Sequence, residues 1–216
     1  MATIKDYYNQ GFFDNFGNKN EPIEIKEFLE KEKEFLKKYL KPNSKVLEIG
    51  CGEGRLLEQI AKNHALVYGI DFAENMIRKA KRKLNTYENT NVFHMDAQNL
   101  LFIDNFFDYS LCMCSSFSNM PGIEERVVQE MTRVTKPGGE ILIHVLSSKV
   151  KSIHEELYRS MGLTNIVTKG NVTRTAEGII SRRFSEEDLH KIMKTTQLKY
   201  EITKICDIGY LVIGKK

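Results

Sequence analysis

The sequence predicts an α/β fold, in which a mostly parallel β-sheet carries helices on both faces. Three observations support this prediction. Short apolar runs alternate with amphipathic helical stretches between Lys45 and Leu146, as in parallel strands joined by helical crossovers. A glycine-rich loop connects the first apolar run to the first of these helices. Two more apolar runs follow near residue 200 with only a short turn between them, so we expect them to form an antiparallel pair.

Length and composition indicate an ordinary globular protein. We expect a single domain over residues 1–216, which is long enough to bury a substantial core. The net charge of +3 is too small to indicate a nucleic-acid partner. No stretch has the character of a signal peptide or the length of a membrane span. The four cysteines lie on or beside expected strands and lack metal-site spacing, so we expect a cytoplasmic protein with reduced thiols and no metal.

Residues 1–41 predict a helical lead-in to the sheet. Apolar side chains recur at helical spacing on one face, while Lys and Glu fill the other. An aromatic cluster precedes this helix, and its simplest interpretation is apolar contact with the rest of the domain. The helical face consists of Ile25, Phe28, Leu29, Phe35, Leu36, Tyr39 and Leu40. The aromatic cluster consists of Tyr7, Tyr8, Phe12, Phe13 and Phe16.

The glycine-rich loop predicts a cofactor site. The apolar run Val46–Ile49 leads into Gly50, Gly52 and Gly54, and a helix-compatible stretch begins at Arg55. Glycine has no Cβ and tolerates positive φ, so a ligand can approach the backbone closely. The helix start behind the loop supplies unpaired N–H groups and the positive end of a dipole. The third glycine comes one residue earlier than in the G-x-G-x-x-G fingerprint of dinucleotide-binding proteins.

The next strands also end at residues that suit a binding site. The second ends at Asp71, whose carboxylate can accept hydrogen bonds from both hydroxyls of a ribose. The third ends at Asp96 and Ala97, and the fourth ends at Cys112. Because the carboxyl ends of parallel strands meet at one edge of a sheet, we expect Gly50 and these residues to line one pocket. The predicted strands are Val46–Ile49, Leu66–Ile70, Val92–Met95, Phe107–Cys112 and Glu140–Val145, and the predicted helices are Arg55–Asn63, Ala73–Asn85 and Glu124–Val134.

The C-terminal third predicts a different arrangement. A helix over Val150–Met161 precedes a hairpin within Thr164–Phe184, which has turn residues at Gly170, Asn171 and Gly178. Arg182 and Arg183 belong to a solvated face of that hairpin or contact an anionic substrate. A Ser-x-x-Asp capping box at Ser185–Asp188 opens a helix to about Thr196. The closing strands are Tyr200–Cys206 and Tyr210–Ile213.

Five features in this order carry a family resemblance: the loop Glu48–Gly54, Asp71, Asp96, the polar stretch after Cys112 and the turn Arg133–Gly139. Together they resemble the class I S-adenosylmethionine-dependent methyltransferases. The first loop and the last turn look most like the branch that includes the ubiquinone and menaquinone C-methyltransferases. The resemblance covers roughly residues 45–146. It implies a Rossmann-like sheet of seven strands, mostly parallel, with an antiparallel last strand.

The resemblance also implies a cofactor, S-adenosyl-L-methionine, whose product is S-adenosyl-L-homocysteine. In the family, the backbone of the loop that matches Gly50, Gly52 and Gly54 contacts the amino-acid moiety of the cofactor. Glu48 is then expected to brace the loop or to bind the cofactor's amino group through water. Cys51 is expected to be a small packing residue at the cofactor and not a nucleophile.

Further cofactor contacts follow from the same resemblance. Asp71 is the expected ribose clamp, the alternative being a cap for the following helix. Phe72 and Met76 are expected to flank the adenine. Asp96 is expected to accept a hydrogen bond from the adenine amine and the Ala97 N–H to serve a ring nitrogen; the alternative for Asp96 is an Asx-turn.

The implied chemistry is direct displacement at a sulfonium methyl, which needs a base only if the acceptor arrives protonated. Cys112 and Met113 are expected near the methyl group and the ribose. The catalytic residues are not fixed by the sequence. His144 and Tyr8 are weak candidates for a base, and Asn119 for orienting the acceptor. The alternative for His144 is a hydrogen-bonded core histidine.

We therefore expect methyl transfer to an oxygen, nitrogen or carbon atom of a small-molecule acceptor by a monomer or homodimer. Residues 1–41 would form a lid and residues 149–184 a substrate-side insert. Base-directed nucleic-acid methylation is disfavoured because Ser115–Asn119 lacks an Asn/Asp-Pro-Pro-aromatic turn. The open alternatives are a protein or RNA methyltransferase, a non-catalytic S-adenosylmethionine-binding protein and a nicotinamide-dependent oxidoreductase.

Overall fold

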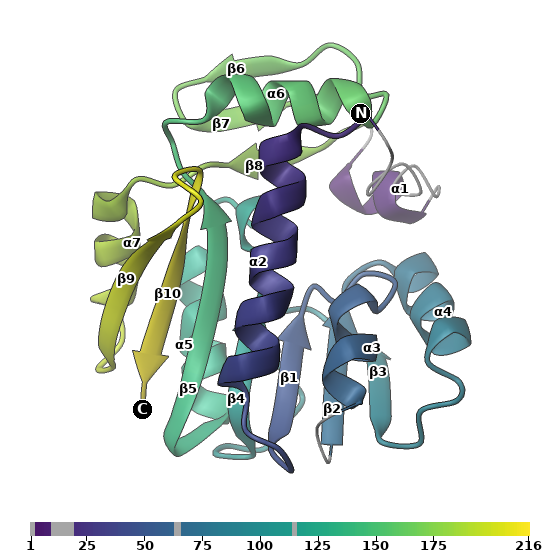
Figure 1. Ribbon diagram of the computed structural model, residues 1–216, viewed down its shortest axis with the longest axis vertical. Helices are drawn as coiled ribbons and strands as arrows, with labels where there is room; N and C mark the ends of the chain where they lie inside the picture. The colour runs from purple at the N-terminus through teal and green to yellow at the C-terminus, as the bar shows by residue number, and fades with distance from the viewer. Residues whose placement is uncertain (1–2, 10–19, 63–65, 114–115) are drawn as a thin grey trace.

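A computed structural model describes residues 3–9, 20–62, 66–113 and 116–216 of the protein (Figure 1). Phe12, Phe13 and Phe16 of the predicted aromatic cluster lie outside the described residues, as does Cys114. Among the helices of the described segments, none combines the length and the apolar character needed to cross a bilayer.

The centre of the protein is a seven-stranded sheet with the order β3-β2-β1-β4-β5-β10-β9. Strands β1 to β5 pair in parallel, and β10 runs antiparallel to both β5 and β9. This confirms the predicted mostly parallel sheet with an antiparallel last strand. The strands are β1 (Lys45–Ile49), β2 (Leu66–Asp71), β3 (Thr90–His94), β4 (Phe107–Cys112), β5 (Thr135–Leu146), β9 (Lys199–Ile205) and β10 (Gly209–Lys215).

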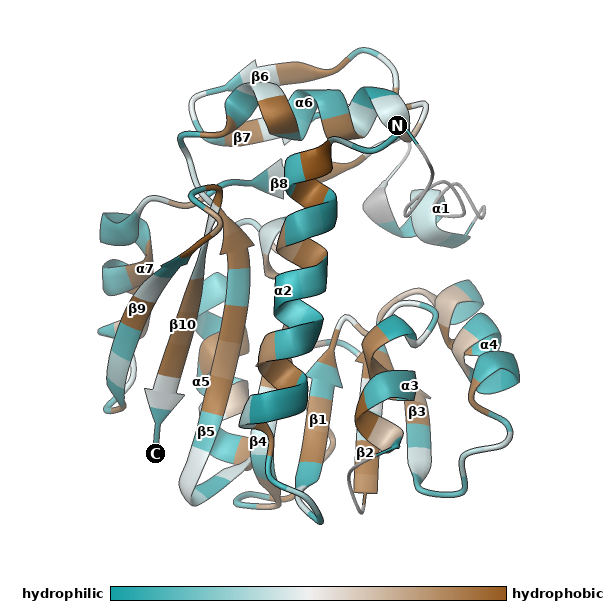
Figure 2. Cartoon of the chain, in the orientation of Figure 1, coloured by the Kyte–Doolittle hydropathy of each residue, from teal (hydrophilic) through white to brown (hydrophobic). Residues whose placement is uncertain are grey.

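Helices cover both faces of the sheet, as predicted (Figure 1). Successive strand residues point to opposite faces, so Val46 packs with one helical layer and Leu47 with the other. Figure 2 shows the apolar residues concentrated along the central strands between these layers. One layer holds α2 (Ile23–Tyr39), α3 (Arg55–Ala61) and α4 (Glu74–Lys83), and the other holds α5 (Glu124–Val134) and α7 (Glu186–Met193).

Most element boundaries agree with the sequence within one or two residues, and α5 and β4 agree at both ends. The capping box of α7 is present, because the Ser185 hydroxyl accepts from the Asp188 N–H and the Asp188 carboxylate accepts from the Ser185 N–H. The helix ends at Met193, earlier than predicted, and the hydroxyl of Thr196 donates to the Met193 carbonyl just beyond it.

The segment between β5 and α7 differs from the prediction. It contains α6 (Lys151–Ser160) and three strands, β6 (Val167–Lys169), β7 (Val172–Arg174) and β8 (Ile180–Arg182), in an antiparallel sheet of order β6-β7-β8. The predicted single hairpin is therefore incomplete, because the chain reverses at both predicted turns. This unit lies beyond the upper ends of β5 and β10 in Figure 1. Its apolar side chains pack with those of α2, and Tyr7 of α1 (Ile4–Asn9) joins the same cluster.

Candidate active site

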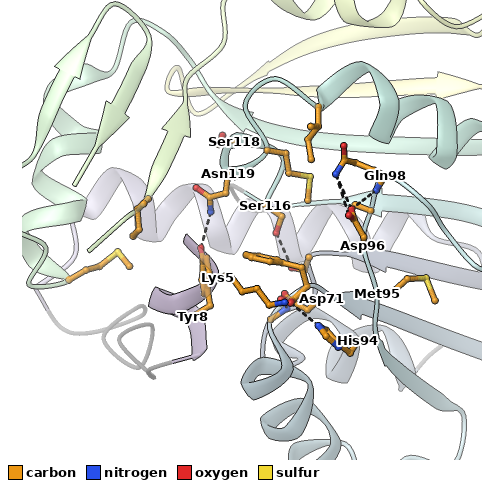
Figure 3. A pocket seen from close by; sticks show the side chains of 18 of the residues that line it. Lys5, Tyr8, Asp71, His94, Met95, Asp96, Gln98, Ser116, Ser118 and Asn119 are labelled. Carbon is orange, nitrogen blue, oxygen red and sulfur yellow. Dashed lines mark hydrogen bonds between the residues drawn. The ribbon is translucent and has the colours of Figure 1, made fainter. Parts of the chain in front are cut away.

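A cavity of about 580 Å³ lies at the carboxyl edge of the parallel strands. The loops after β1, β2, β3 and β4 form one part of its wall, and residues of α1 and α6 form another (Figure 3). Its volume falls within the range of roughly 300–1,000 Å³ that is typical of small-molecule sites. The strand order reverses direction between β1 and β4, which is where open α/β sheets bind their ligands.

The glycine loop exposes backbone to this cavity. Gly50 and Gly52 line it and have positive φ angles of 72° and 54°. A Cβ on Gly50 would lie 2.6 Å from the Ser116 Cβ, so a larger residue would displace the loop after β4. A Cβ on Gly52 would have no atom within 4 Å. The Ser116 hydroxyl donates to the Gly50 carbonyl at 2.8 Å and joins the two loops.

Asp71 connects the glycine loop to the end of β2. One carboxylate oxygen accepts from the Gly52 N–H at 3.0 Å and the other from the Ala73 N–H at 2.8 Å. Burial raises the pKa of Asp71, while these backbone hydrogen bonds oppose that shift. Each oxygen has further lone pairs, so the group can accept additional hydrogen bonds from a ligand. Asp71 is not the N-cap residue of α4, which is Ala73, but its hydrogen bond to the Ala73 N–H still satisfies a backbone donor at the start of that helix.

The loop after β3 supplies the next part of the wall. Asp96 and Ala97 both line the cavity, as does Phe72 from the loop after β2. Asp96 accepts hydrogen bonds from the backbone N–H of Gln98 at 2.8 Å and from its side-chain amide at 3.3 Å. This is the Asx-turn that the sequence left open, and the same carboxylate also borders the cavity.

The structure places six of the predicted cofactor residues away from the cavity wall. Cys112 and Met113 are buried in the two main core clusters, because the end of β4 is covered by helices on both faces. Met76 points into the protein from α4. We therefore no longer expect the side chains of these three residues to contact the cofactor. The remaining three are Glu48, Cys51 and Gly54, which belong to the loop Glu48–Gly54 but do not line the cavity.

Glu48 is buried among other charged groups. Burial raises its pKa to about 8, and the nearby negative charges of Glu32 and Asp71 add to this effect while Arg55 opposes it. One of its carboxylate oxygens has no hydrogen-bond partner within the described part of the chain. The surroundings of Glu48, at the end of β1, therefore favour its neutral form.

Of the three candidate catalytic residues, two lie at the cavity and one does not. His144 is fully buried and stacks on the Phe28 ring, with 3.9 Å between the ring centroids. Its Nδ1 lies 2.7 Å from a carboxylate oxygen of Glu32. His144 is therefore the core histidine of the alternative interpretation. Tyr8 and Asn119 both line the cavity, and the Asn119 amide donates to the Tyr8 hydroxyl at 2.9 Å (Figure 3).

Sequence reasoning missed several residues of the wall. Ser118 and the α6 residues His154 and Tyr158 border the cavity, and Lys5 of α1 does so as well. A signal for the α6 residues was present, because His154, Tyr158 and the apolar Leu157 share one helical face. Arg183 is only 1% exposed, so its interpretation as part of a solvated face is wrong.

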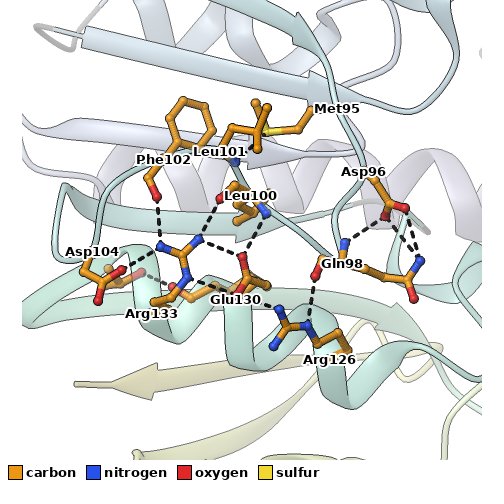
Figure 4. A network of polar contacts seen from close by, with 12 residues as sticks. Met95, Asp96, Gln98, Leu100, Leu101, Phe102, Asp104, Arg126, Glu130 and Arg133 are labelled. Atoms are coloured by element: carbon orange, nitrogen blue, oxygen red, sulfur yellow. Dashed lines mark hydrogen bonds and ion pairs between the residues drawn. The ribbon is translucent and has the colours of Figure 1, made fainter.

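A polar network holds the loop that carries Asp96 against α5 (Figure 4). The Arg133 guanidinium donates to the carbonyls of Leu100 and Phe102 and pairs with Glu130 at 2.7 Å. Glu130 in turn accepts from the Leu100 N–H at 2.8 Å. The arginine that opens the predicted turn Arg133–Gly139 therefore has a structural role behind the site.

We expect Arg133→Met to lower the free energy of unfolding by about 2–3 kcal/mol, because it leaves two carbonyls and a buried carboxylate without their charged donor. The hydrogen bond from Arg133 lowers the pKa of Glu130 below 4.5. This contribution to stability is present above that pH and is lost as the pH falls below it. Urea unfolding at several pH values should therefore show a smaller acid dependence in the variant. Arg126→Met, which removes the longer 3.3 Å ion pair to Glu130 from a more exposed position of α5, should have a smaller effect, and equal effects of both changes would contradict the assignment.

The region that contains these loops is similar to known proteins. Residues 46–139 match the methyltransferase-domain family. The matched span includes the glycine loop, Asp71, Asp96 and the turn that begins at Arg133.

A curated relative supports the predicted branch. The chain is 34% identical over 124 residues to a demethylmenaquinone methyltransferase of Staphylococcus haemolyticus, an overlap of 56% of this chain and 51% of that protein. The chain thus spans about half the length of the curated relatives it matches. This similarity confirms the resemblance to the quinone methyltransferase branch.

Solved structures share the fold. The PH0226 protein of Pyrococcus horikoshii OT3 aligns with a TM-score of 0.74 and 21% identity, covering 94% of this chain and 97% of its own. The 1,6-didemethyltoxoflavin-N1-methyltransferase of Burkholderia thailandensis aligns with a TM-score of 0.71 and 14% identity, covering 99% and 87%. That structure contains bound 1,6-didemethyltoxoflavin and S-adenosylhomocysteine. At these identities the similarity establishes the fold.

Proposed function

We propose that the protein is an S-adenosylmethionine-dependent methyltransferase that acts on a small molecule. The observation that carries this proposal is the arrangement of the Asp71 carboxylate and the Gly50–Gly52 backbone on one cavity wall. The name of the staphylococcal relative and the ligands of the Burkholderia structure support the same activity.

The residues of the cavity fit the proposed cofactor. Gly52 has open space where a Cβ would lie, so an amino-acid moiety can rest against its backbone. Asp71 would accept hydrogen bonds from the ribose hydroxyls, and Phe72, Asp96 and Ala97 would surround the adenine. When bound, S-adenosylmethionine supplies an electrophilic methyl group on a sulfonium.

The protein's contribution to the reaction is mainly to position the acceptor and exclude water. Alignment of two reactants can lower a barrier by about 7–11 kcal/mol in favourable cases. We propose that α1 acts as a lid, through Lys5 and Tyr8, and that residues 149–184 form the acceptor side, through α6. Asn119 would orient the acceptor, since its amide oxygen is buried at the wall without a hydrogen-bond partner in the described segments.

Two measurements test this function. Calorimetry should show binding of S-adenosylhomocysteine, and failure to bind at ~1 mM ligand, a weak affinity, would contradict the proposal. Methyl-labelled S-adenosylmethionine should then transfer its label to compounds in a filtered metabolite extract. Label that appears only in protein or RNA would favour the macromolecular alternative. Binding without transfer to any fraction would favour a non-catalytic role.

A further inference from the structure

Behind the acceptor side of the cavity lies a buried arginine whose hydrogen-bond partners are neutral groups. Arg183 follows β8 and is 1% exposed. Within the described residues, its guanidinium hydrogen-bonds to His154 Nδ1 at 3.0 Å, the Thr173 hydroxyl at 3.0 Å and the Gly170 carbonyl at 3.2 Å. Its Nε is buried without a hydrogen-bond partner in those segments. Burial lowers the pKa of Arg183, and the charge of the nearby Glu155 carboxylate on α6 opposes this shift. A buried guanidinium with no carboxylate hydrogen-bonded to it is costly, and an anion that binds close by reduces that cost.

Arg183 determines which ring nitrogen of His154 carries the proton. Because Arg183 donates to Nδ1, the lone pair of that nitrogen is occupied, and the ring proton of a neutral imidazole must reside on Nε2. Burial and the charge of Arg183 lower the pKa of His154 to about 3, so the ring stays neutral at physiological pH. His154 is therefore held as a hydrogen-bond donor through Nε2–H and is unsuited to act as a general base.

The Nε2–H donor makes a weak hydrogen bond that a ligand oxygen could replace. Its partner in the described chain is the Ser181 hydroxyl at 3.4 Å, which is long for an N–H···O hydrogen bond. The Ser181 oxygen already accepts from the Tyr158 hydroxyl at 2.6 Å. Both His154 and Tyr158 line the cavity, and Arg183 lies behind them with its positive charge.

We propose that Arg183 and His154 form an oxyanion-recognition device, in which His154 Nε2–H binds an anionic oxygen of the methyl acceptor. The acceptor class is a small molecule that carries a phenolate, enolate or carboxylate. This inference rests on the proposed methyltransferase function, since it identifies the ligand of the same cavity. The charge of Arg183 strengthens the Nε2–H donor through the ring. The bound anion adds negative charge near a guanidinium that has only neutral hydrogen-bond partners in the described residues.

The test compares 2-naphthoate with its neutral analogue 2-naphthamide, as ligands of the protein saturated with S-adenosylhomocysteine. We expect the wild type to bind 2-naphthoate at least about tenfold more tightly, as for one charge-assisted hydrogen bond. His154→Phe should abolish this preference, because it preserves the ring contact with Tyr158 but removes the donor. His154→Gln should retain part of it, because the glutamine amide can replace Nε2–H.

Affinity for S-adenosylhomocysteine should be unchanged in both variants, which separates this proposal from the proposed function. If the homocysteine product does not bind at all, the methyltransferase assignment fails. Three results would overturn the oxyanion proposal even if S-adenosylhomocysteine binds. They are equal binding of the two naphthalene ligands, no binding of either, and a preference for 2-naphthoate that persists in His154→Phe. Nitrogen-15 NMR should also show the His154 ring as the neutral Nε2–H tautomer throughout pH 5 to 8. Protonation of His154 in that range would contradict the oxyanion proposal.

Discussion

Asp71→Ala is expected to weaken the binding of S-adenosylhomocysteine by about 100- to 1,000-fold. The change would remove the two charge-assisted hydrogen bonds that we propose Asp71 makes to the ribose, at about 1.5–3 kcal/mol each. It also removes the acceptor that holds the Gly52 and Ala73 N–H groups in place. Titration calorimetry of the variant and the wild type measures the difference directly.

Two further variants sharpen this test. Asp71→Asn keeps the shape and one acceptor oxygen, so its affinity should be intermediate. Glu187→Ala removes a highly exposed carboxylate from α7 and should leave the affinity unchanged. If Asp71→Ala is folded and binds like the wild type, the carboxylate does not hold the cofactor.

Glu32→Ala is expected to lower the free energy of unfolding by about 3–5 kcal/mol, the typical cost of breaking a buried ion pair from one side. Glu32 is 1% exposed and joins α2 to two other elements. Its carboxylate lies 2.7 Å from Nδ1 of His144 in β5 and 2.7 Å from the Arg55 guanidinium in α3. Urea or thermal unfolding provides the measurement.

The pKa of Glu32 predicts how the loss of stability depends on pH. Burial opposes ionisation of Glu32, but the hydrogen bond and charge of His144, together with Arg55, outweigh it and lower the pKa below 4.5. The stabilisation is present above that pH and is lost as the pH falls through the lowered value. The difference between Glu32→Ala and the wild type should therefore shrink in acid.

Two further variants test the role of Glu32: one on the same helix and one that replaces both Glu32 and His144. Glu30→Ala, at an exposed position of α2, should change stability by less than about 0.5 kcal/mol. The double variant Glu32→Leu with His144→Phe should recover much of the lost stability, because an apolar pair can replace a buried ionic one. A large loss with Glu30→Ala, or no loss with Glu32→Ala, would contradict the role assigned to the pair.

Local sequence patterns were sufficient for the main sheet and its helices. Strand β4 and helix α5 have the predicted bounds because their apolar residues repeat with the periods of a strand and a helix. The three-stranded unit was predicted incompletely for the opposite reason. Its strands are three residues long and largely exposed along β6, so they carry little periodic signal.

The same contrast applies to the site. Gly50, Gly52, Asp71 and Asp96 were predicted because each comes at the end of a strand, and the topology brings those ends together. Sequence spacing could not show that Cys112 is buried in the core, since helix packing determines what covers the end of a strand.

The sequence alone determined the order of strands and helices and the loops that meet at the carboxyl edge, because both depend on residues close together in the chain. The tertiary structure decided which ionisable groups face the cavity and which face one another. Glu32 and His144 are 112 positions apart, and Arg183 and His154 are 29 apart. Their protonation and partners depend on burial and charge at distances of a few ångströms, which only packing of the whole chain sets.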